Sequence, residues 1–320
     1  MKCLGRLVVV CTVALAAALP AGMAGADTTI KIVVPSTPGG GADVLARMLA
    51  DQISRAQGRT LVVENRPGAG NTIGTEAVAR SAPDGNTLLI TTPEFIINPH
   101  LRKLNYDPLT GFAQICLLAR SPQLLMVNPA SPYRTLKDLL DAAKAKPGEI
   151  TLASAGPASS PHVVIERLKR EAKVDITYVP FQGTGPALNA LLGQHVSGVL
   201  ASYPNVAGQI KSGQLRAVVT PAASRVPDLP DVQTITENGF KDFDFDLWFG
   251  LVAPAGTPKD KLDQYAEWFK AALKDKDIQA KAKAQGLFEV GACGSEADAF
   301  TRKQHEEYGK AIRDAGIKVN

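Results

Sequence analysis

The stretch IKIVVPSTPGGGADVLARMLA, residues 30–50, contains the pattern on which the fold prediction rests. Its first five residues form a short run rich in β-branched side chains, which is typical of a strand. Three glycines follow, and from Asp43 to Ser54 apolar residues recur at helical spacing. A strand, a glycine turn and a helix in this order predict the start of a βαβ unit, in which helices cover a parallel sheet.

Outward from this stretch the same alternation continues in two series. The first series predicts strands at 61–63 and 87–91 around a helix at 72–80. The second predicts helices at 135–145, 161–171 and 186–192, and strands at 150–153, 175–179, 196–201 and 215–220. Amphipathic helices at 259–274 and 296–315 close the chain. Two such series predict an α/β protein with two lobes, each a sheet flanked by helices.

Two long apolar stretches separate the series, at 114–127 and 245–253, and we interpret them as strands that cross between the lobes. We therefore assign residues 27–125 and 247–320 to the first lobe and 126–246 to the second. A small ligand is expected between the lobes, because parallel sheets bind ligands at the carboxyl ends of their strands.

The N-terminus has the pattern of an export signal. A basic start is followed by an apolar run from Leu7 to Leu19 and by the small-x-small site Ala24-Gly25-Ala26. The run is shorter than the roughly 20 residues of a membrane span. Cys11 lies inside the run, whereas a lipoprotein is acylated just after it. We expect residues 1–26 to be a cleaved signal peptide and the mature chain to be a periplasmic monomer.

Composition excludes several classes of function. The net charge of +4 falls to +2 when Lys2 and Arg6 leave with the signal. The remaining basic residues are scattered, so a nucleic-acid-binding stripe is not indicated. Cys116 and Cys293 are the cysteines left in the mature chain. They either pair in an oxidising compartment or are two separate buried thiols, and the sequence leaves both open. With no CxxC and no Cys/His cluster, neither a metal site nor a cofactor is predicted.

Enzyme motifs are not found either. The chain has no GxSxG and no HExxH. Ser160 and His162 are two residues apart on a predicted helix, where side chains do not face each other. A glycine cluster at 68–74 has the spacing GxGxxxG and does not directly follow a strand, so it does not match a dinucleotide fingerprint. The turn at 36–41 is the stronger candidate, because glycine N–H groups and the following helix N-terminus favour an anion.

Several blocks together resemble the periplasmic receptors of the tripartite tricarboxylate transporter family, also called Bug receptors. They cover the mature chain in order: IKIVVPSTPGGGADVLAR, VVENRPGAGNTIGTEAVARSAPDGNTLLI, NYDPLTGF, LASAGPASSPH, VPFQGTGPALNALLGQHV, GQIKSGQLRAVV and LWFGLVAPAGTP. The resemblance implies a Venus-flytrap fold and an organic-anion ligand, namely a mono- or dicarboxylate or an acidic amino acid. It also implies a membrane permease as partner, with no nucleic acid and no enzymatic activity.

The resemblance also indicates where ligand contacts are expected. In the first lobe they are Ser36, Thr37, Pro38, Gly39, Gly40, Gly41, Thr92, Glu94 and Phe95. In the second lobe they are Ser154, Ala155, Gly156, Ser159, Ser160, His162, Phe181, Thr184, Gly185, Ala201 and Tyr203. For the serines, helix capping alone is the alternative, and for Phe181 it is core packing. Asp43 is expected to cap the glycine turn.

This sequence departs from the family pattern at three positions. Ala201 stands where many relatives have an acidic residue, Gln182 where a basic one is common, and Glu94 in a loop that is commonly uncharged. Ligand identity therefore cannot be transferred from a relative. A receptor that presents its ligand to a sensor kinase would have the same fold, so this output remains an alternative to transport.

Overall fold

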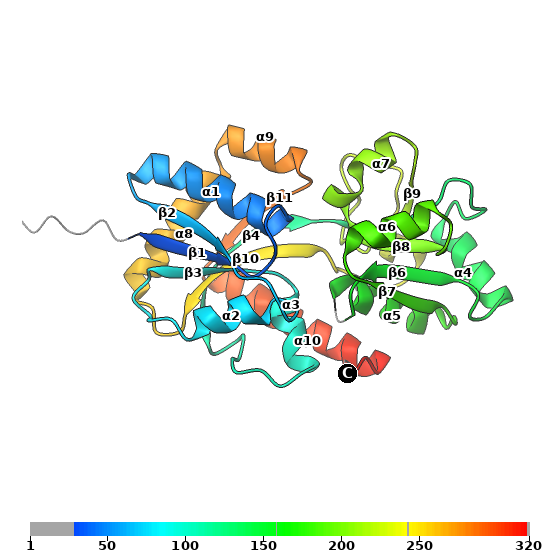
Figure 1. The fold of residues 1–320 in the computed structure, drawn as a ribbon, viewed down its shortest axis with the longest axis horizontal. Coiled ribbons are helices and arrows are strands. Elements are labelled where there is room, and N and C mark those ends of the chain that lie inside the picture. Colours follow the sequence, from blue (N-terminus) through cyan, green and yellow to red (C-terminus); the bar gives the residue numbers. More distant parts are fainter. Residues whose placement is uncertain (1–28, 158, 242, 319–320) are drawn as a thin grey trace, which may run out of the picture.

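The computed structural model describes residues 29–157, 159–241 and 243–318, and in it the chain forms two α/β lobes that lie side by side (Figure 1). The predicted two-lobed architecture of sheets flanked by helices is confirmed. The predicted signal peptide lies outside the described residues. Among the described helices, none is long and apolar enough to cross a membrane.

The first lobe is built on a six-stranded sheet with the order β11-β4-β10-β3-β1-β2. Its strands are β1 (Ile30–Val34), β2 (Leu61–Asn65), β3 (Thr87–Thr91), β4 (Phe112–Ser121), β10 (Leu247–Pro254) and β11 (Phe288–Cys293). β1 pairs in parallel with β2 and β3, while β10 runs antiparallel to β3 and β4. The carboxyl ends of β1, β2 and β3 therefore lie at one edge of the sheet.

Helices cover both faces of this sheet. On one face lie α1 (Gly41–Gln57), α8 (Lys259–Leu273) and α9 (Lys276–Ala284), and on the other α2 (Thr72–Ala79), α3 (Glu94–Ile97), the short 3-10 helix η1 (Asn98–His100) and α10 (Ser295–Ala315). Ile32 and Val34 of β1 pack with the first set, and Val33 packs with the second. Successive strand residues point to opposite faces, so the part of β1 that is covered on both sides is apolar, whereas Lys31 near its start reaches Glu64 at 2.8 Å.

The second lobe has a five-stranded sheet with the order β7-β6-β8-β5-β9. Its strands are β5 (Gln123–Val127), β6 (Thr151–Ala155), β7 (Thr177–Phe181), β8 (Gly198–Ser202) and β9 (Arg216–Val219). Its helices are α4 (Leu136–Ala145), α5 (Ser160–Ala172), α6 (Thr184–Leu192) and α7 (Ala207–Lys211), with short 3-10 helices η2 (Tyr203–Asn205) and η3 (Thr236–Asn238). α4 and α5 pack on one face, and α6 and α7 on the other (Figure 1).

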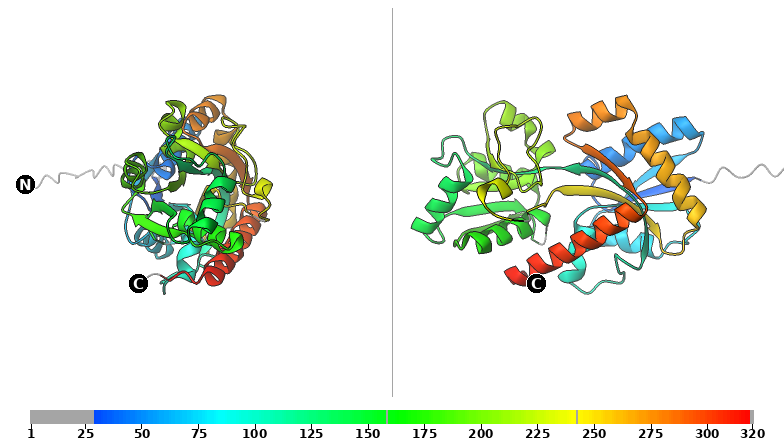
Figure 2. Two further views of the ribbon diagram at one scale, coloured as in Figure 1. Left: turned by 90° about the vertical axis from the view of Figure 1, so that its right-hand side faces the viewer. Right: turned by 180° about the vertical axis from the view of Figure 1, so that it is seen from behind.

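The lobes are connected by two crossings and one helix. β4 belongs to the first sheet and β5 to the second, with Pro122 alone between them. The predicted first lobe ended at residue 125, whereas Gln123 already pairs with Ser202 of the second sheet. The return crossing leads into β10. α10 extends from the first lobe along the second, where it packs against α5 (Figure 2).

The two remaining cysteines form a disulfide between Cys116 of β4 and Cys293 of β11. The two residues are direct neighbours on adjacent antiparallel strands. Of the two alternatives left open by the sequence, the paired one is found. The bond fastens the edge strand β11 to the sheet across a sequence separation of 177 residues.

Candidate functional site

A cavity of about 550 Å³ lies between the two lobes. The first lobe contributes Ala69, Gly70, Asn71, Glu94, Asn98 and Arg102 to its wall. The second contributes Ala155, Gly156, Pro157, Ser159, Phe181, Gln182 and Gly183. These residues are the last residues of β6 and β7 or lie in the segments that follow β2, β3, β6 and β7, so the cavity is formed at carboxyl ends of parallel strands in both sheets.

The first-lobe wall contains a backbone loop of unusual conformation. Four successive residues, Gly68 to Asn71, all have positive φ, at 130°, 48°, 65° and 74°. Ala69 and Asn71 are strained there, because side chains with a Cβ rarely adopt this region. Asn98 Nδ2 donates to the Gly70 carbonyl at 2.7 Å, and Arg102 Nη1 lies 3.4 Å from the Ala69 carbonyl. Such strain persists where surrounding contacts enforce it and is typical of ligand sites.

The same wall carries a directed chain of hydrogen bonds. Asn71 Nδ2 donates to Thr92 Oγ1 at 3.2 Å, and the Thr92 hydroxyl donates to Glu94 Oε2 at 2.7 Å. Thr92 is buried, and it positions Glu94 without lining the cavity itself. The carboxylate of Glu94 is therefore oriented by the fold.

The second-lobe wall is made by the starts of two helices. Ser159 is the N-cap residue of α5 and Gly183 that of α6, and neither helix has a side-chain cap. α2, whose N-cap residue Asn71 also lines the cavity, is likewise uncapped by a side chain. α8 and α10 also lack such caps, so the missing cap alone does not mark a site. The convergence of three uncapped helix N-termini on one cavity, however, indicates a binding site, because their N–H groups and dipoles favour an anion.

Buried polar contacts support the loop between β6 and α5. Tyr178 OH donates to the Gly156 carbonyl at 2.7 Å and lies 2.9 Å from Ser154 Oγ. The ring of His162 stacks on Tyr178 with the centroids 4.0 Å apart. Burial raises the pKa of Tyr178 to about 12 and lowers the pKa of His162, which favours the neutral imidazole. Gly156, with a φ of 86° and open space where a Cβ would be, is thus held at the cavity wall.

The predicted glycine turn has its own internal partner. Gly39 N–H donates to Asp43 Oδ2 at 2.9 Å, and Asn65 Nδ2 donates to both Asp43 Oδ1 and the Ser36 carbonyl. Burial opposes ionisation of Asp43, but the hydrogen bonds from Arg47, Gly39 and Asn65 outweigh it and hold the pKa of this carboxyl below its usual value. The predicted capping role of Asp43 is confirmed. The turn lies on the side of the first lobe that faces the second (Figure 1), outside the lining of the 550 Å³ cavity.

Other candidate residues are divided among three places. Five line the cavity: Glu94, Ala155, Gly156, Ser159 and Phe181. Thr184 and Gly185 lie in the first turn of α6, directly after the lining residue Gly183. Behind the wall lie Thr92, Ser154, Ser160 and His162, all of which are buried.

Three further candidates do not reach the cavity. Phe95 packs against Tyr106 and Phe112 in the first-lobe core. Ala201 and Tyr203 are buried in the second-lobe core, and Tyr203 OH donates to Asp228 Oδ2 at 3.1 Å. Their apolar surface is used for packing, which is the physical reason that they do not line the cavity.

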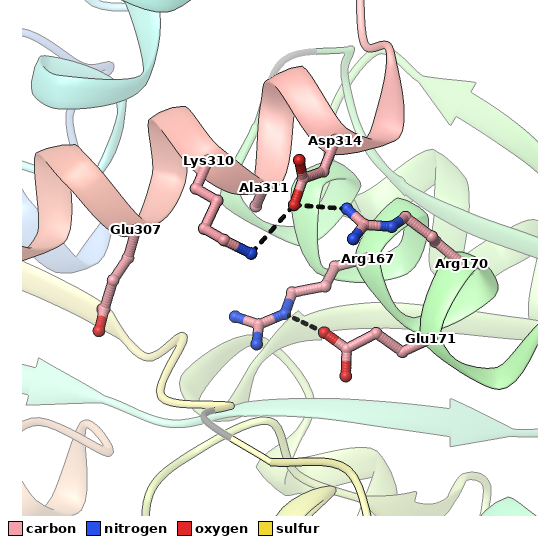
Figure 3. A pocket seen from close by; sticks show the side chains of 7 residues that line it. All are labelled: Arg167, Arg170, Glu171, Glu307, Lys310, Ala311 and Asp314. Atoms are coloured by element: carbon pink, nitrogen blue, oxygen red, sulfur yellow. Dashed lines mark hydrogen bonds and ion pairs between the residues drawn. The ribbon is translucent and has the colours of Figure 1, made fainter.

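A second cavity, of about 190 Å³, lies between α5 and α10 (Figure 3). Its charged side chains are already paired, all of them with one another except Glu307, whose carboxylate lies 3.7 Å from Lys303 Nζ. Arg170 Nη1 lies 2.6 Å from Asp314 Oδ2, Lys310 Nζ lies 3.1 Å from the same oxygen, and Arg167 Nε donates to Glu171 at 2.8 Å. We interpret this crevice as part of the contact between the lobes and not as a ligand site.

Comparison with known proteins agrees with this architecture. A sequence model described as "Tripartite tricarboxylate transporter family receptor" matches residues 45–317. The chain belongs to this receptor family. Protein BugT of Bordetella pertussis is 32% identical over 98% of both chains. The family consists of solute-binding receptors.

Solved structures of similar proteins have the same two-lobed fold. The periplasmic binding protein BugD is 34% identical, with a TM-score of 0.78 over 91% of this chain and 98% of BugD. R. palustris Rpa4515, solved with adipate, is 29% identical, with a TM-score of 0.81 over 91% of this chain and 98% of the other. The predicted family and fold class of this receptor are therefore confirmed.

Sequence reasoning missed part of the receptor's cavity wall. The missed residues are Ala69, Gly70, Asn71, Asn98, Arg102, Pro157 and Gly183, whereas Gln182 also lines the cavity and was noted as a departure from the family pattern. The GAGN segment belongs to a glycine cluster that matches a block of the family resemblance, but its spacing does not by itself indicate a ligand-binding loop. Arg102 follows η1 and has no local motif around it, so only the packing of α3 and η1 against the 68–71 loop reveals it.

Proposed function

We propose that this protein is a periplasmic solute receptor that binds a small organic carboxylate between its lobes and delivers it to a tripartite tricarboxylate-type membrane permease. The observation that carries the proposal is the interlobe cavity, at which the N-termini of α2, α5 and α6 converge without side-chain caps. The adipate in the related R. palustris protein supports an organic acid as ligand.

The electrostatics of the cavity favour one carboxylate. Each helix N-terminus carries roughly half a positive elementary charge. Arg102 lines the same cavity, and no carboxylate of the described chain pairs with it. Its Nε is buried without a hydrogen-bond partner. Uncapped helix starts on both walls and the charge of Arg102 are suited to an anion that arrives from solution, while Glu94 on the first-lobe wall carries the opposite charge.

The connection between the lobes supports capture by closure. In the described part of the chain, two crossings and α10 join the lobes, and the cavity lies between the lobes. A ligand that contacts both walls favours the closed arrangement by its additional contacts there. This is the working cycle expected of a receptor that passes its ligand to a membrane partner.

A hydrolase-type role has no support in the site. Ser160 Oγ is 2.7 Å from Tyr308 OH and accepts from Gln123 Nε2, so it is committed to buried contacts. His162 stacks on Tyr178. Ser159 Oγ donates to the Gly156 carbonyl at 3.0 Å. The serines next to the cavity thus serve the loop structure, which favours binding over catalysis.

Calorimetric titration of the mature protein with adipate, succinate, malate and glutamate tests the proposal. We expect at least one acid to bind, and Arg102→Met to weaken it about tenfold or more, as expected for loss of a charge-assisted hydrogen bond of about 1.5–3 kcal/mol. Lys103→Met, at the exposed neighbouring residue, is the matched control and leaves affinity unchanged. Failure of every acid to bind at millimolar concentration would contradict the proposal.

A further inference from the structure

The cavity contains two charged side chains of opposite sign that are not paired with each other. Glu94 and Arg102 both lie on the first-lobe wall, and the second-lobe wall contributes no charged side chain. Within the described part of the chain, neither forms an ion pair with any other side chain. Several carboxylates on the surface outside the cavity are paired, among them Glu64 with Lys31 and Asp51 with Arg55. Two unpaired charges at one cavity indicate a ligand that supplies both partners.

Glu94 is held for such a contact. Its Oε2 accepts the hydroxyl hydrogen of Thr92, whose oxygen is in turn fixed by the Asn71 amide. The other carboxylate oxygen, Oε1, accepts no hydrogen bond from the described residues. The Thr92 hydroxyl donates to one carboxylate oxygen of Glu94, so the other oxygen remains for the ligand.

An amine-free dicarboxylate fits this arrangement poorly. One of its carboxylates is favoured by Arg102 and the helix N-termini, but Glu94 repels the ligand's net charge of about −2 in a partly desolvated cavity. The charges of the Glu94 and Arg102 side chains together sum to zero. A ligand with a carboxylate and a protonated amine places each charge opposite its counterpart.

We propose that Glu94 selects an amino carboxylate, binding the ligand's ammonium group while Arg102 and the helix N-termini bind its carboxylate. This inference rests on the proposed function for the carboxylate end. It adds a specificity-determining residue and a narrower ligand class. An aliphatic body packs on Phe181, which faces the same cavity from the second lobe.

Matched ligand pairs that differ only in the amine test the inference. They are aspartate and succinate, glutamate and glutarate, alanine and propionate, and 4-aminobutyrate and butyrate, each titrated calorimetrically. We expect at least one amine-bearing acid to bind tenfold or more tightly than its partner. Glu94→Gln keeps an acceptor for Thr92 but removes the charge, and we expect it to reduce that ratio about tenfold. Glu306→Gln, at an exposed position of α10, is the control and keeps the ratio.

The outcomes separate the two proposals. If amine-free acids bind as tightly as their partners, or if Glu94→Gln leaves the ratio unchanged, the selection by Glu94 is wrong while carboxylate binding stands. If no acid of either kind binds, the proposed function is wrong and the inference is overturned with it.

Discussion

Asp246 is the buried carboxyl whose titration we expect to control the stability of the crossing between the lobes. It directly precedes β10. Its Oδ1 is buried without a hydrogen-bond partner, and its nearest cation, Arg120 Nη1, is 3.9 Å from Oδ2. The same Arg120 nitrogen lies 3.0 Å from Asp244 Oδ1, so the guanidinium is shared. Burial, followed by the neighbouring charge of Asp244, raises the pKa of Asp246 from 3.8 to about 7, with Arg120 opposing both.

The direction of the pH effect follows from this shift. The folded state holds the proton more tightly than the unfolded state, so the stability from Asp246 is fully present below pH 3.8 and is lost as the pH rises through about 7. A shift of about 3 units corresponds to about 4 kcal/mol at most. Asp246→Asn is neutral at every pH and avoids this loss. The difference in free energy of unfolding between variant and wild type should therefore grow by up to about 4 kcal/mol between pH 4 and 8.

Urea denaturation followed by circular dichroism at pH steps from 4 to 9 measures this difference. Asp51→Asn, at a carboxylate on α1 whose side chain is 64% exposed, serves as the control, for which we expect a nearly constant difference. A difference for Asp246→Asn that does not change between pH 4 and 8 would refute the reasoning, because it would mean that the crossing accommodates the charged carboxylate without penalty.

Three further results are expected. Replacing Cys116 and Cys293 together by Ser should lower the free energy of unfolding by about 5 kcal/mol in urea melts, since the bond closes a separation of 177 residues; equal stability with and without reductant in the wild type would contradict this. Gly39→Ala should destabilise the protein by about 1–2 kcal/mol, because the φ of Gly39 is 83°. Gly40→Ala should be nearly neutral, since the φ of Gly40 is −76° and a Cβ there meets only the Thr37 carbonyl at 3.7 Å. Thermal melts that rank the two variants in the reverse order would refute this account of the turn. Tyr308→Phe should cost about 1 kcal/mol in the same melts by removing the 2.7 Å contact with Ser160. A loss no larger than that of Tyr133→Phe, at a half-buried tyrosine, would count against it.

The local part of this fold could be predicted from the sequence. β1, β3 and the start of α2 lie where the pattern predicted them, because buried strands and helix starts leave a signal within a few residues. The Asp43 cap was predictable for the same reason, since its partner Gly39 is four residues away.

The sequence pattern does not predict helices and strands that contain few buried apolar residues. α9, Lys276–Ala284, buries only Ile278 and Ala282, too few to define a helical face. β11 contains Gly291 with a φ of 65° and a register shift between Glu289 and Ala292, so it resembles a loop in sequence. Arg102 and Asn98 reach the cavity by tertiary packing, which no local spacing encodes.

Ser160 lies between the cavity and the segments that connect the two lobes. Ser160 begins α5, one residue after the cavity-lining Ser159. Its hydroxyl contacts Tyr308 of α10 and Gln123 of β5, and Gln123 Nε2 also donates to the Phe245 carbonyl on the return crossing. Hydrogen bonds through Ser160 and Gln123 therefore link the two crossings and α10 to the start of the helix whose N-terminus faces the cavity. If the protein binds its ligand between the lobes as proposed, we expect a ligand that draws this helix end toward the first lobe to act directly on the two crossings and α10.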